Sequence, residues 1–276
     1  MPVTIKKRLD DKNLHIAASV FNPLTAAMAQ DTGFDCAVVG GSVMAASKHL
    51  TPDVGLLTLS ELVEGVYRIA SHSELPLIVD GDSGYGNALN AQRLVKDLER
   101  AGASAVTIED TVLPYRYGNR SGLCDTQEQQ DKLAAAVEAR RSNDYSIIAR
   151  TRFLASESPN ALQARVAAYS STGVDALCLF GDVDAEGLAN IKAVTDLPLM
   201  VISYNAGETE QALYRSQGVS ILLNGHHAFE ASVVAMMQCY QRLAGQPVSQ
   251  ETGKALLKKY TQAAQCEAFA KRYVGL

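Results

Sequence analysis

The sequence has 276 residues, of which 47% are hydrophobic and 20% charged, and its formal net charge is −5 at pH 7. These proportions are ordinary for a globular protein, and the acidic balance argues against nucleic acid as a main partner. No apolar stretch approaches the ~20 residues that span a bilayer, so we expect no membrane partner. The five cysteines are scattered without a Cys-x-x-Cys pair, which predicts a cytoplasmic protein with neither a disulfide framework nor a structural zinc site.

Short apolar runs alternate with longer amphipathic stretches along the chain. The short runs are rich in β-branched residues, as expected for a parallel sheet covered on both faces. They predict strands at residues 15–20, 36–39, 77–80, 105–108, 146–149, 176–179, 199–202 and 220–223. The amphipathic stretches predict helices at residues 60–71, 88–101, 127–141, 160–171 and 185–194, and further helices at 228–243, 250–260 and 262–273.

Four joints between these elements read helix, glycine, strand, with the glycines at positions 33, 102, 173 and 218. A glycine just past a helix end is the usual C′ residue. About eight repeated βα units predict one (β/α)8 barrel domain over residues 1–276. An open doubly wound sheet is the alternative, because a strand count does not prove closure. Residues 244–276 are predicted to form a C-terminal helical extension that could pack on a neighbouring subunit.

The run at residues 79–87, Val-Asp-Gly-Asp-Ser-Gly-Tyr-Gly-Asn, is the most informative local pattern. Along a strand, residues i and i+2 share a face, so Asp80 and Asp82 are predicted to look into the same space. Two such charges repel unless a cation lies near them, and Mg²⁺ prefers oxygen ligands. A plain turn is the alternative, since Asp and Gly are common turn residues. The next predicted strand also ends in acids, Glu109 and Asp110, which favours the metal site.

Two other loop types do not fit this run. An EF-hand needs a Glu at a spacing that the sequence lacks. A Rossmann loop needs a third glycine, and carboxylates here stand where phosphates need backbone amides. The metal site and the plain turn therefore remain the two interpretations of residues 79–87.

Reactive side chains also follow other predicted strands, where a barrel places its active site. They are Gly40, Gly41 and Ser42, then Asp80 and Asp82, Glu109 and Asp110, Arg150, Ser203 to Asn205, and Asn224 to His227. Each has a structural alternative: Arg150 could be a surface residue, His226 a polar residue at a helix start, and Ser42 a helix cap. The histidines before residue 80, His15 among them, are interpreted as structural. The six strand ends taken together are the stronger signal.

At these residues the whole chain resembles the isocitrate lyase/phosphoenolpyruvate mutase superfamily. The resemblance rests on Gly40-Gly41-Ser42, Asp53, the run from Asp80 to Asn87, Ile108-Glu109-Asp110 and Ile148-Ala149-Arg150. It implies a (β/α)8 barrel that binds Mg²⁺, with Mn²⁺ possible because both ions prefer oxygen ligands. It also implies a small 2-oxo acid substrate and a homotetramer in which a C-terminal helix is exchanged between paired subunits.

The resemblance implies a metal set at matching positions of this sequence. Asp80 would hold Mg²⁺ most directly. Asp82 and Glu109 would bind it through waters, and Asp53 would lie nearby.

The resemblance likewise implies the substrate contacts. Gly41, Ser42 and Val43 would cradle the oxo-acid carboxylate or enolate with backbone amides and a hydroxyl. Arg150 would pair with a substrate carboxylate, and Asn224 would also bind substrate.

Proton handling would fall to Tyr204 and His226, because His is the natural proton carrier near neutral pH.

The loop after the fourth strand distinguishes members of the superfamily. Carbon–carbon lyases carry Lys-Arg/Lys-Cys-Gly-His there, whereas residues 115–120 read Tyr-Arg-Tyr-Gly-Asn-Arg, with Tyr117 at the thiol position. A phenol titrates near ~10 against ~8.5 for a thiol, so it is a poorer base at neutral pH. The Lys-Thr-Asn-Ser loop of the phosphonate mutases is also missing.

The chain most resembles the bacterial oxaloacetate decarboxylase branch, which implies Mg²⁺-dependent conversion of oxaloacetate, or a related 2-oxo acid, to pyruvate and CO2. A methylisocitrate-type lyase and a phosphonopyruvate hydrolase or mutase-like enzyme stay as alternatives. Arg152 stands where a small polar residue is expected, and an inward-pointing Arg152 would change which acid is preferred.

Overall fold

Eight parallel strands close into a barrel, which confirms the fold predicted from the sequence and excludes the open sheet. The computed structural model describes residues 4–114, 122–153 and 157–275. Each strand pairs with the next one in the chain, and β8 pairs back to β1. The strands are β1 (His15–Ser19), β2 (Ala37–Val39), β3 (Leu77–Asp80), β4 (Ala105–Glu109), β5 (Ser146–Arg152), β6 (Ala176–Phe180), β7 (Leu199–Ser203) and β8 (Val219–Asn224).

The strands bury apolar side chains on both faces. On β3, Leu77 and Val79 belong to the cluster between the strands and the surrounding helices, whereas Ile78 belongs to the cluster inside the barrel. Each such side chain stabilises the fold by about 1.5–3 kcal/mol when it leaves water. This two-sided burial explains why the strands read as continuous apolar runs and not as alternating ones.

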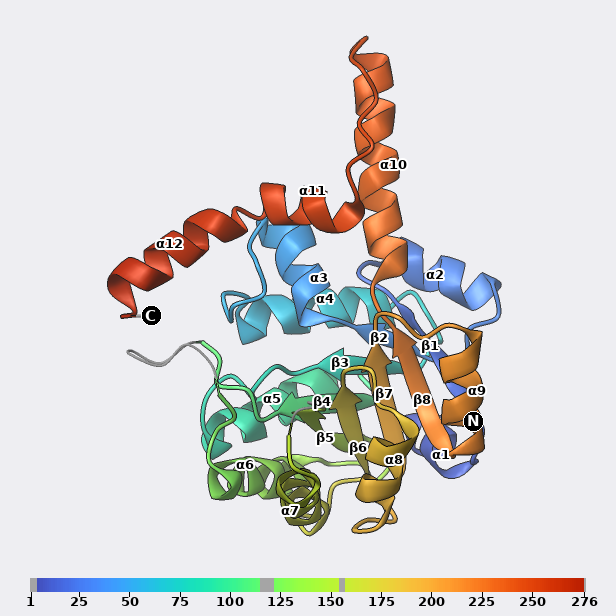
Figure 1. Ribbon diagram of the computed structural model, residues 1–276, viewed down its shortest axis with the longest axis vertical. Coiled ribbons are helices and arrows are strands. Elements are labelled where there is room, and N and C mark those ends of the chain that lie inside the picture. Colours follow the sequence, from blue (N-terminus) through green and yellow to red (C-terminus); the bar gives the residue numbers. More distant parts are fainter. Residues whose placement is uncertain (1–3, 115–121, 154–156, 276) are drawn as a thin grey trace.

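Helices surround the barrel, with α10 continuing away from it (Figure 1). They are α1 (Ile5–Asp10), α2 (Pro23–Asp31), α3 (Gly41–Met44), which continues into a π-helical segment (Ala45–His49), α4 (Leu59–Ala70), α5 (Ala88–Arg100), α6 (Thr126–Ala139), α7 (Pro159–Ser170), α8 (Ala185–Lys192) and α9 (Glu208–Ser216). The four predicted glycines past helix ends all have positive φ, between 63° and 94°, as the C′ interpretation requires.

Helices α1 and α3 were not predicted, and α2 and α9 were indicated only by the glycines that follow them, at positions 33 and 218. In α2 the apolar residues do not form one buried stripe, because Leu24 and Met28 are largely exposed. Its start is instead set by Asn22, which caps the helix and precedes Pro23. Strand β5 is also three residues longer than predicted, and this extension places Arg150 and Arg152 within the sheet.

The N-terminal ends of the strands are closed by α1. Its residues Ile5 and Leu9 are almost fully buried and join the apolar cluster inside the barrel. Ser220 of β8 donates a hydrogen bond to the Leu9 carbonyl at 3.0 Å. This end of the barrel is therefore filled and held by packing.

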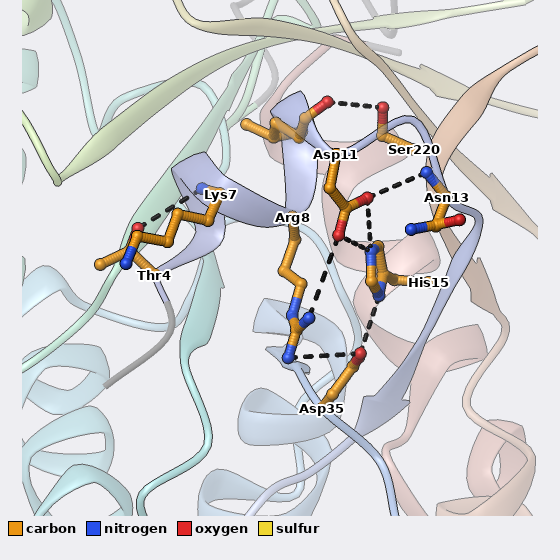
Figure 2. Close-up of polar contacts among 9 residues, drawn as sticks. Thr4, Lys7, Arg8, Asp11, Asn13, His15, Asp35 and Ser220 are labelled. Atoms are coloured by element: carbon orange, nitrogen blue, oxygen red, sulfur yellow. Dashed lines mark hydrogen bonds and ion pairs between the residues drawn. The ribbon is translucent and has the colours of Figure 1, made fainter. Parts of the chain in front are cut away.

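A network of paired charged side chains lies beside α1 (Figure 2). His15 places Nε2 2.9 Å from Asp11 Oδ2 and Nδ1 2.8 Å from Asp35 Oδ2. Arg8 lies 3.5 Å from Asp35. These contacts agree with the structural interpretation of His15.

The last three helices form a C-terminal arm (Figure 1). They are α10 (His227–Leu243), α11 (Gly253–Tyr260) and α12 (Ala263–Tyr273). Helix α10 runs away from the barrel, and the chain then returns so that α11 packs against the base of α10. No residue of α12 is buried, and Phe269 and Tyr273 are more than half exposed. Helices α11 and α12 fall within the predicted extension at residues 244–276. Across the described residues, no helix combines the length and apolar character that crossing a membrane requires.

Candidate active site

A cavity of about 140 Å³ opens among the C-terminal ends of the strands. Its polar lining comes from β3, β4, β5 and the segments that follow β2, β7 and β8. The lining includes Gly40, Ser42, Asp53, Asp80, Thr107, Glu109, Thr111, Leu113, Arg150, Arg152, Phe180, Tyr204 and His226. This volume is below the ~300–1,000 Å³ of sites for drug-sized ligands, so the cavity suits a small molecule.

Carboxyl groups crowd at this cavity and disturb one another. The pKa of Asp53 is raised to about 6, first by burial and then by the nearby charge of Asp80. Burial raises the pKa of Asp82 well above its ordinary value, and Asp80, Asp53 and Glu109 raise it further. Burial also raises the pKa of Glu109, against the opposing effect of Arg150. The cluster therefore carries more negative charge than its surroundings balance.

Asp82 belongs to the turn after β3 and not to the strand, so the turn, and not the alternation of side chains along a strand, places it near the other carboxyl groups. Strand β3 ends at Asp80, and Asp82 has a φ of +46°, a left-handed conformation unusual for Asp. A side chain on Gly81 would put its Cβ 2.7 Å from the Thr107 carbonyl oxygen, so only glycine fits there. The Asp82 carbonyl accepts a hydrogen bond from the Glu109 amide at 2.8 Å, which ties the two acidic segments together.

Arg150 is the cation nearest to the cluster. Its Nη1 donates to Asp80 Oδ1 at 2.8 Å, and its Nη2 lies 3.2 Å from Glu109 Oε2. Its guanidinium also lies over the Phe180 ring, 5.3 Å from the centroid. The surface interpretation of Arg150 is therefore wrong, since its side chain is 12% exposed and enclosed by acids.

His226 is held at the opposite wall of the cavity. Its Nδ1 lies 2.7 Å from Ser19 Oγ, and burial lowers its pKa to about 4, so the ring is neutral at pH 7. A Cβ on Gly40 would come within 2.7 Å of His226 Cε1, so the ring packs directly on this glycine. The Tyr204 ring is 5.9 Å from the His226 ring, and burial raises the pKa of its phenol to about 12. At pH 7 the phenol is therefore protonated, whereas the His226 ring is a neutral hydrogen-bonding group.

The remaining predicted residues lie at different depths. Ser42 lines the cavity, and Gly41 lies against Asp82, whose Oδ1 would be 3.4 Å from a Cβ at that position. Val43 is buried and does not line this cavity. Asn224 also lies outside the lining, where its Nδ2 donates to the Ala206 carbonyl at 2.8 Å. The structure therefore places most of the predicted residues on the cavity wall, with Gly41 and Asp82 behind it and Val43 and Asn224 apart from it.

The donor chemistry of the cluster fits a hard divalent cation. Within the part of the chain that the structure describes, no three His, Cys, Asp or Glu side chains meet closely enough to enclose an ion. Mg²⁺ does not need such a cage, because it usually keeps several waters and takes one or two carboxylates. The raised pKa values of Asp53, Asp82 and Glu109 show that negative charge there is costly without a cation. The residues present therefore fit Mg²⁺ bound partly through water.

Some residues of the site were not predicted. Ser19 reaches His226 from 207 positions away, and no local pattern signals such a contact. Thr111 and Leu113 line the cavity just beyond the acids of β4. Their position shortly after a strand end is the one signal that could have found them. The predicted gating loop with Tyr117 lies outside the described residues.

Comparisons with known proteins agree with this geometry. A model of the family described as phosphoenolpyruvate phosphomutase matches residues 5–244. An oxaloacetate decarboxylase of Pseudomonas paraeruginosa is 41% identical over 268 residues, which cover 96% of this chain and 93% of that protein. An oxaloacetate decarboxylase of Chromohalobacter salexigens is 39% identical over 270 residues, covering 97% and 94%. A crystal structure of phosphonopyruvate hydrolase with oxalate and Mg²⁺ has a TM-score of 0.78 and 30% identity, covering 98% and 97%.

Proposed function

The chain belongs to the phosphoenolpyruvate phosphomutase family, and on that premise we propose that it converts oxaloacetate, or a closely related 2-oxo acid, to pyruvate and CO2 with Mg²⁺. The observation that carries the proposal is the crowding of carboxyl groups beside Arg150 and His226 at one small cavity, which Asp53, Asp80 and Glu109 line. The decarboxylases that are 39–41% identical over nearly the whole chain support the same reaction.

We propose that Asp80 holds Mg²⁺ directly, with Asp82 and Glu109 bound through waters and Asp53 nearby; Mn²⁺ is the alternative ion. The bound ion supplies Lewis acidity, which takes up negative charge as the bond between C3 and C4 breaks. The raised pKa values in the cluster support this assignment, because a divalent cation relieves the repulsion that raises them.

The substrate contacts follow from the position of the cavity wall. The amides of Gly41 and Ser42 begin α3 and have no partner within the helix, so they can donate to a developing enolate oxygen. The Ser42 hydroxyl lines the same wall. Arg150 would orient the bound acid by contact with a carboxylate.

The proton needed at C3 would come from the Tyr204 phenol, with the neutral His226 ring beside it as a hydrogen-bond donor. When the C3–C4 bond breaks, CO2 leaves and its electron pair forms an enolate, which becomes pyruvate once C3 takes up a proton. A Ser19 hydroxyl that donates to His226 Nδ1 leaves the hydrogen of the neutral ring on Nε2, from which it can donate a hydrogen bond to the reacting acid. The high pKa of Tyr204 keeps its phenol protonated for the same purpose.

We also propose that the chain forms a homotetramer with an exchanged C-terminal helix. The support is the arm of α10 to α12, which exposes Tyr240, Leu243, Phe269 and Tyr273. Exposed apolar groups in one arm mark an interaction surface. Light scattering after size exclusion tests this state directly. A cytoplasmic location is part of the same proposal, and the structure joins none of the five cysteines in a disulfide.

The test of the reaction is pyruvate formation from oxaloacetate with Mg²⁺, corrected for a metal blank without enzyme. Asp80→Ala and His226→Ala should each lower turnover by about 10²–10³, the range for loss of a group that stabilises developing charge. His72→Ala, at an exposed histidine, is the matched control and should keep full activity. Wild-type rates at the blank level would refute the proposal, and phosphonopyruvate and 2-methylisocitrate would then be the substrates to assay.

A further inference from the structure

The cavity contains a second arginine that the proposed reaction does not use. Arg152 is the last residue of β5, where it pairs with Phe180 of β6. Alternate residues of a strand share a face, so Arg150 and Arg152 point to the same side of the sheet, with Arg152 one step nearer the mouth. Arg152 lines the cavity and is exposed, whereas Arg150 is enclosed.

The two guanidinium groups differ in how their charge is balanced. Arg150 contacts two carboxylates, Asp80 and Glu109. Among the described residues, the Arg152 guanidinium has no hydrogen-bond or ion-pair partner, although its charge lowers the pKa of Asp53. Of the two described arginines that line the cavity, Arg152 is thus the one whose charge is available to an incoming anion.

The backbone of Arg152 is fixed although its side chain is free. Arg165 of α7 donates from Nη2 to the Arg152 carbonyl at 3.1 Å and from Nε to Thr151 Oγ1 at 2.9 Å. The Thr151 hydroxyl in turn donates to the buried Asp110 at 2.6 Å. A charged side chain on a rigid strand end loses less entropy on binding than one on a loose loop.

We propose that Arg152 is the specificity-determining residue for the distal anionic group of the substrate, so that the site prefers 2-oxo acids with a second anionic group on C3. This inference rests on the proposed function for the proximal end, where the 2-oxo carboxylate meets the metal set. It assigns the far carboxylate of oxaloacetate to Arg152, because the charge of Arg150 is already balanced within the protein.

The chemistry of decarboxylation predicts how this contact divides between binding and turnover. The distal carboxylate is the group that leaves as neutral CO2, so a cation that grips it stabilises the ground state more than the transition state. Arg152→Gln should therefore raise KM for oxaloacetate about tenfold and leave kcat unchanged or higher. Because Arg152 is exposed, the wild-type KM should also rise with ionic strength.

Binding probes separate this role from turnover. Calorimetry with Mg²⁺ would compare oxalate, which lacks a distal group, with phosphonopyruvate, which carries a distal phosphonate. Arg152→Gln should weaken phosphonopyruvate by about tenfold or more and change oxalate by less than about twofold. Arg152→Lys, which keeps a point charge, should recover part of the loss. Arg215→Gln, at an exposed arginine on α9, is the matched control and should change neither ligand.

The outcomes distinguish this inference from the proposed reaction. Equal losses for both ligands, or no loss for either, in Arg152→Gln would overturn the assignment even if the wild type decarboxylates oxaloacetate. A selective loss for phosphonopyruvate would support it even if oxaloacetate turnover stays at the blank level. Wild-type turnover at the blank level, together with a selective loss of phosphonopyruvate affinity in Arg152→Gln, would refute the decarboxylase proposal and leave the distal contact in place.

Discussion

The two ends of the barrel both gather charged side chains, but only one end balances them. At the N-terminal end, His15 contacts Asp11 and Asp35, and the Arg8 guanidinium lies beside the same two carboxylates. Although burial raises the pKa of Asp11, hydrogen bonds from His15 and Asn13 lower it below its ordinary value. The folded state thus stabilises the ionised form at this end.

At the C-terminal end the balance is reversed. The pKa values of Asp53, Asp82 and Glu109 are raised, so folding there disfavours the ionised carboxylates. Arg150 contacts only part of this charge. The charge network at the N-terminal end therefore stabilises the fold, whereas the carboxylates at the C-terminal end are suited to binding a ligand. Unbalanced charge is typical of sites where a bound ligand supplies the opposite charge.

The largest effect should follow from removing Arg150. Arg150→Met leaves Asp80 and Glu109 buried without their cation, and breaking a buried pair costs about 3–5 kcal/mol. Urea unfolding in EDTA should show this loss, and Mg²⁺ should restore part of it by supplying the missing charge. Turnover should fall by about a thousandfold, or about 4 kcal/mol. Equal stability of variant and wild type in EDTA would show that the carboxylates do not depend on Arg150.

The pH dependence of the unfolding free energy should also show that the carboxylates at the C-terminal end are not balanced. The pKa of Asp53 is about 6 in the folded protein against 3.8 in its ordinary state, so the folded state holds this proton more tightly. Because Asp53 is an exposed residue, solvent screens part of this effect. Stability without metal should therefore fall as pH rises from about 4 to about 6, by less than the full shift would give. Asp53→Asn should remove that part of the slope in urea titrations with EDTA. Parallel curves for the two proteins would contradict the assignment.

The paired end should respond differently. His15→Gln breaks contacts with two carboxylates and should cost about 1–2 kcal/mol of unfolding free energy. Mg²⁺ should not recover this loss, and turnover should stay within about twofold of wild type because the reacting groups lie at the other end. His72→Gln, at an exposed position, controls for the substitution itself. A loss of turnover in His15→Gln would mean that the two ends are coupled.

The sequence predicted the barrel well because local physics determines it. Strand β3 begins and ends at the predicted residues, since an apolar run bounded by Pro76 and Gly81 leaves little choice. Asp80 lines the cavity and Asp82 does not, and the two are neighbours because the left-handed turn at Asp82 directs its amide to Asp80 Oδ1, which strand alternation does not predict. The end of β5 was predicted too early because charged residues such as Arg150 and Arg152 are not typical of a strand.

Contacts between distant segments were beyond the sequence patterns. His226 was predicted from its place after a strand, but its partner Ser19 belongs to the first strand of the barrel. Barrel closure between β8 and β1 makes these two residues neighbours. Only the closed topology, and no motif, supplies that information.

The smallest expected effects are those of replacing two serines, one at each end of the barrel, on the adjoining strands β1 and β8. Comparing these two variants should distinguish the roles of the two ends. Ser19 contacts His226 at the C-terminal end, and Ser220 donates to the Leu9 carbonyl at the N-terminal end. Ser19→Ala removes the group that fixes the His226 tautomer, so kcat should fall about tenfold while stability changes by less than about 1 kcal/mol. Ser220→Ala leaves a buried carbonyl unpaired, so it should cost about 1 kcal/mol of stability and leave kcat unchanged.

Kinetics and urea unfolding of both serine variants, measured side by side, test this division. The pH profile of kcat adds a readout that packing alone would not move, since freeing His226 Nδ1 should shift the acid limb in Ser19→Ala and not in Ser220→Ala. The reverse pattern, with stability lost at Ser19 and turnover lost at Ser220, would show that hydrogen bonding at the two ends does not divide into structural and catalytic roles. Because the same small change is made to the same residue type on neighbouring strands, a difference between the variants must come from what each hydroxyl contacts.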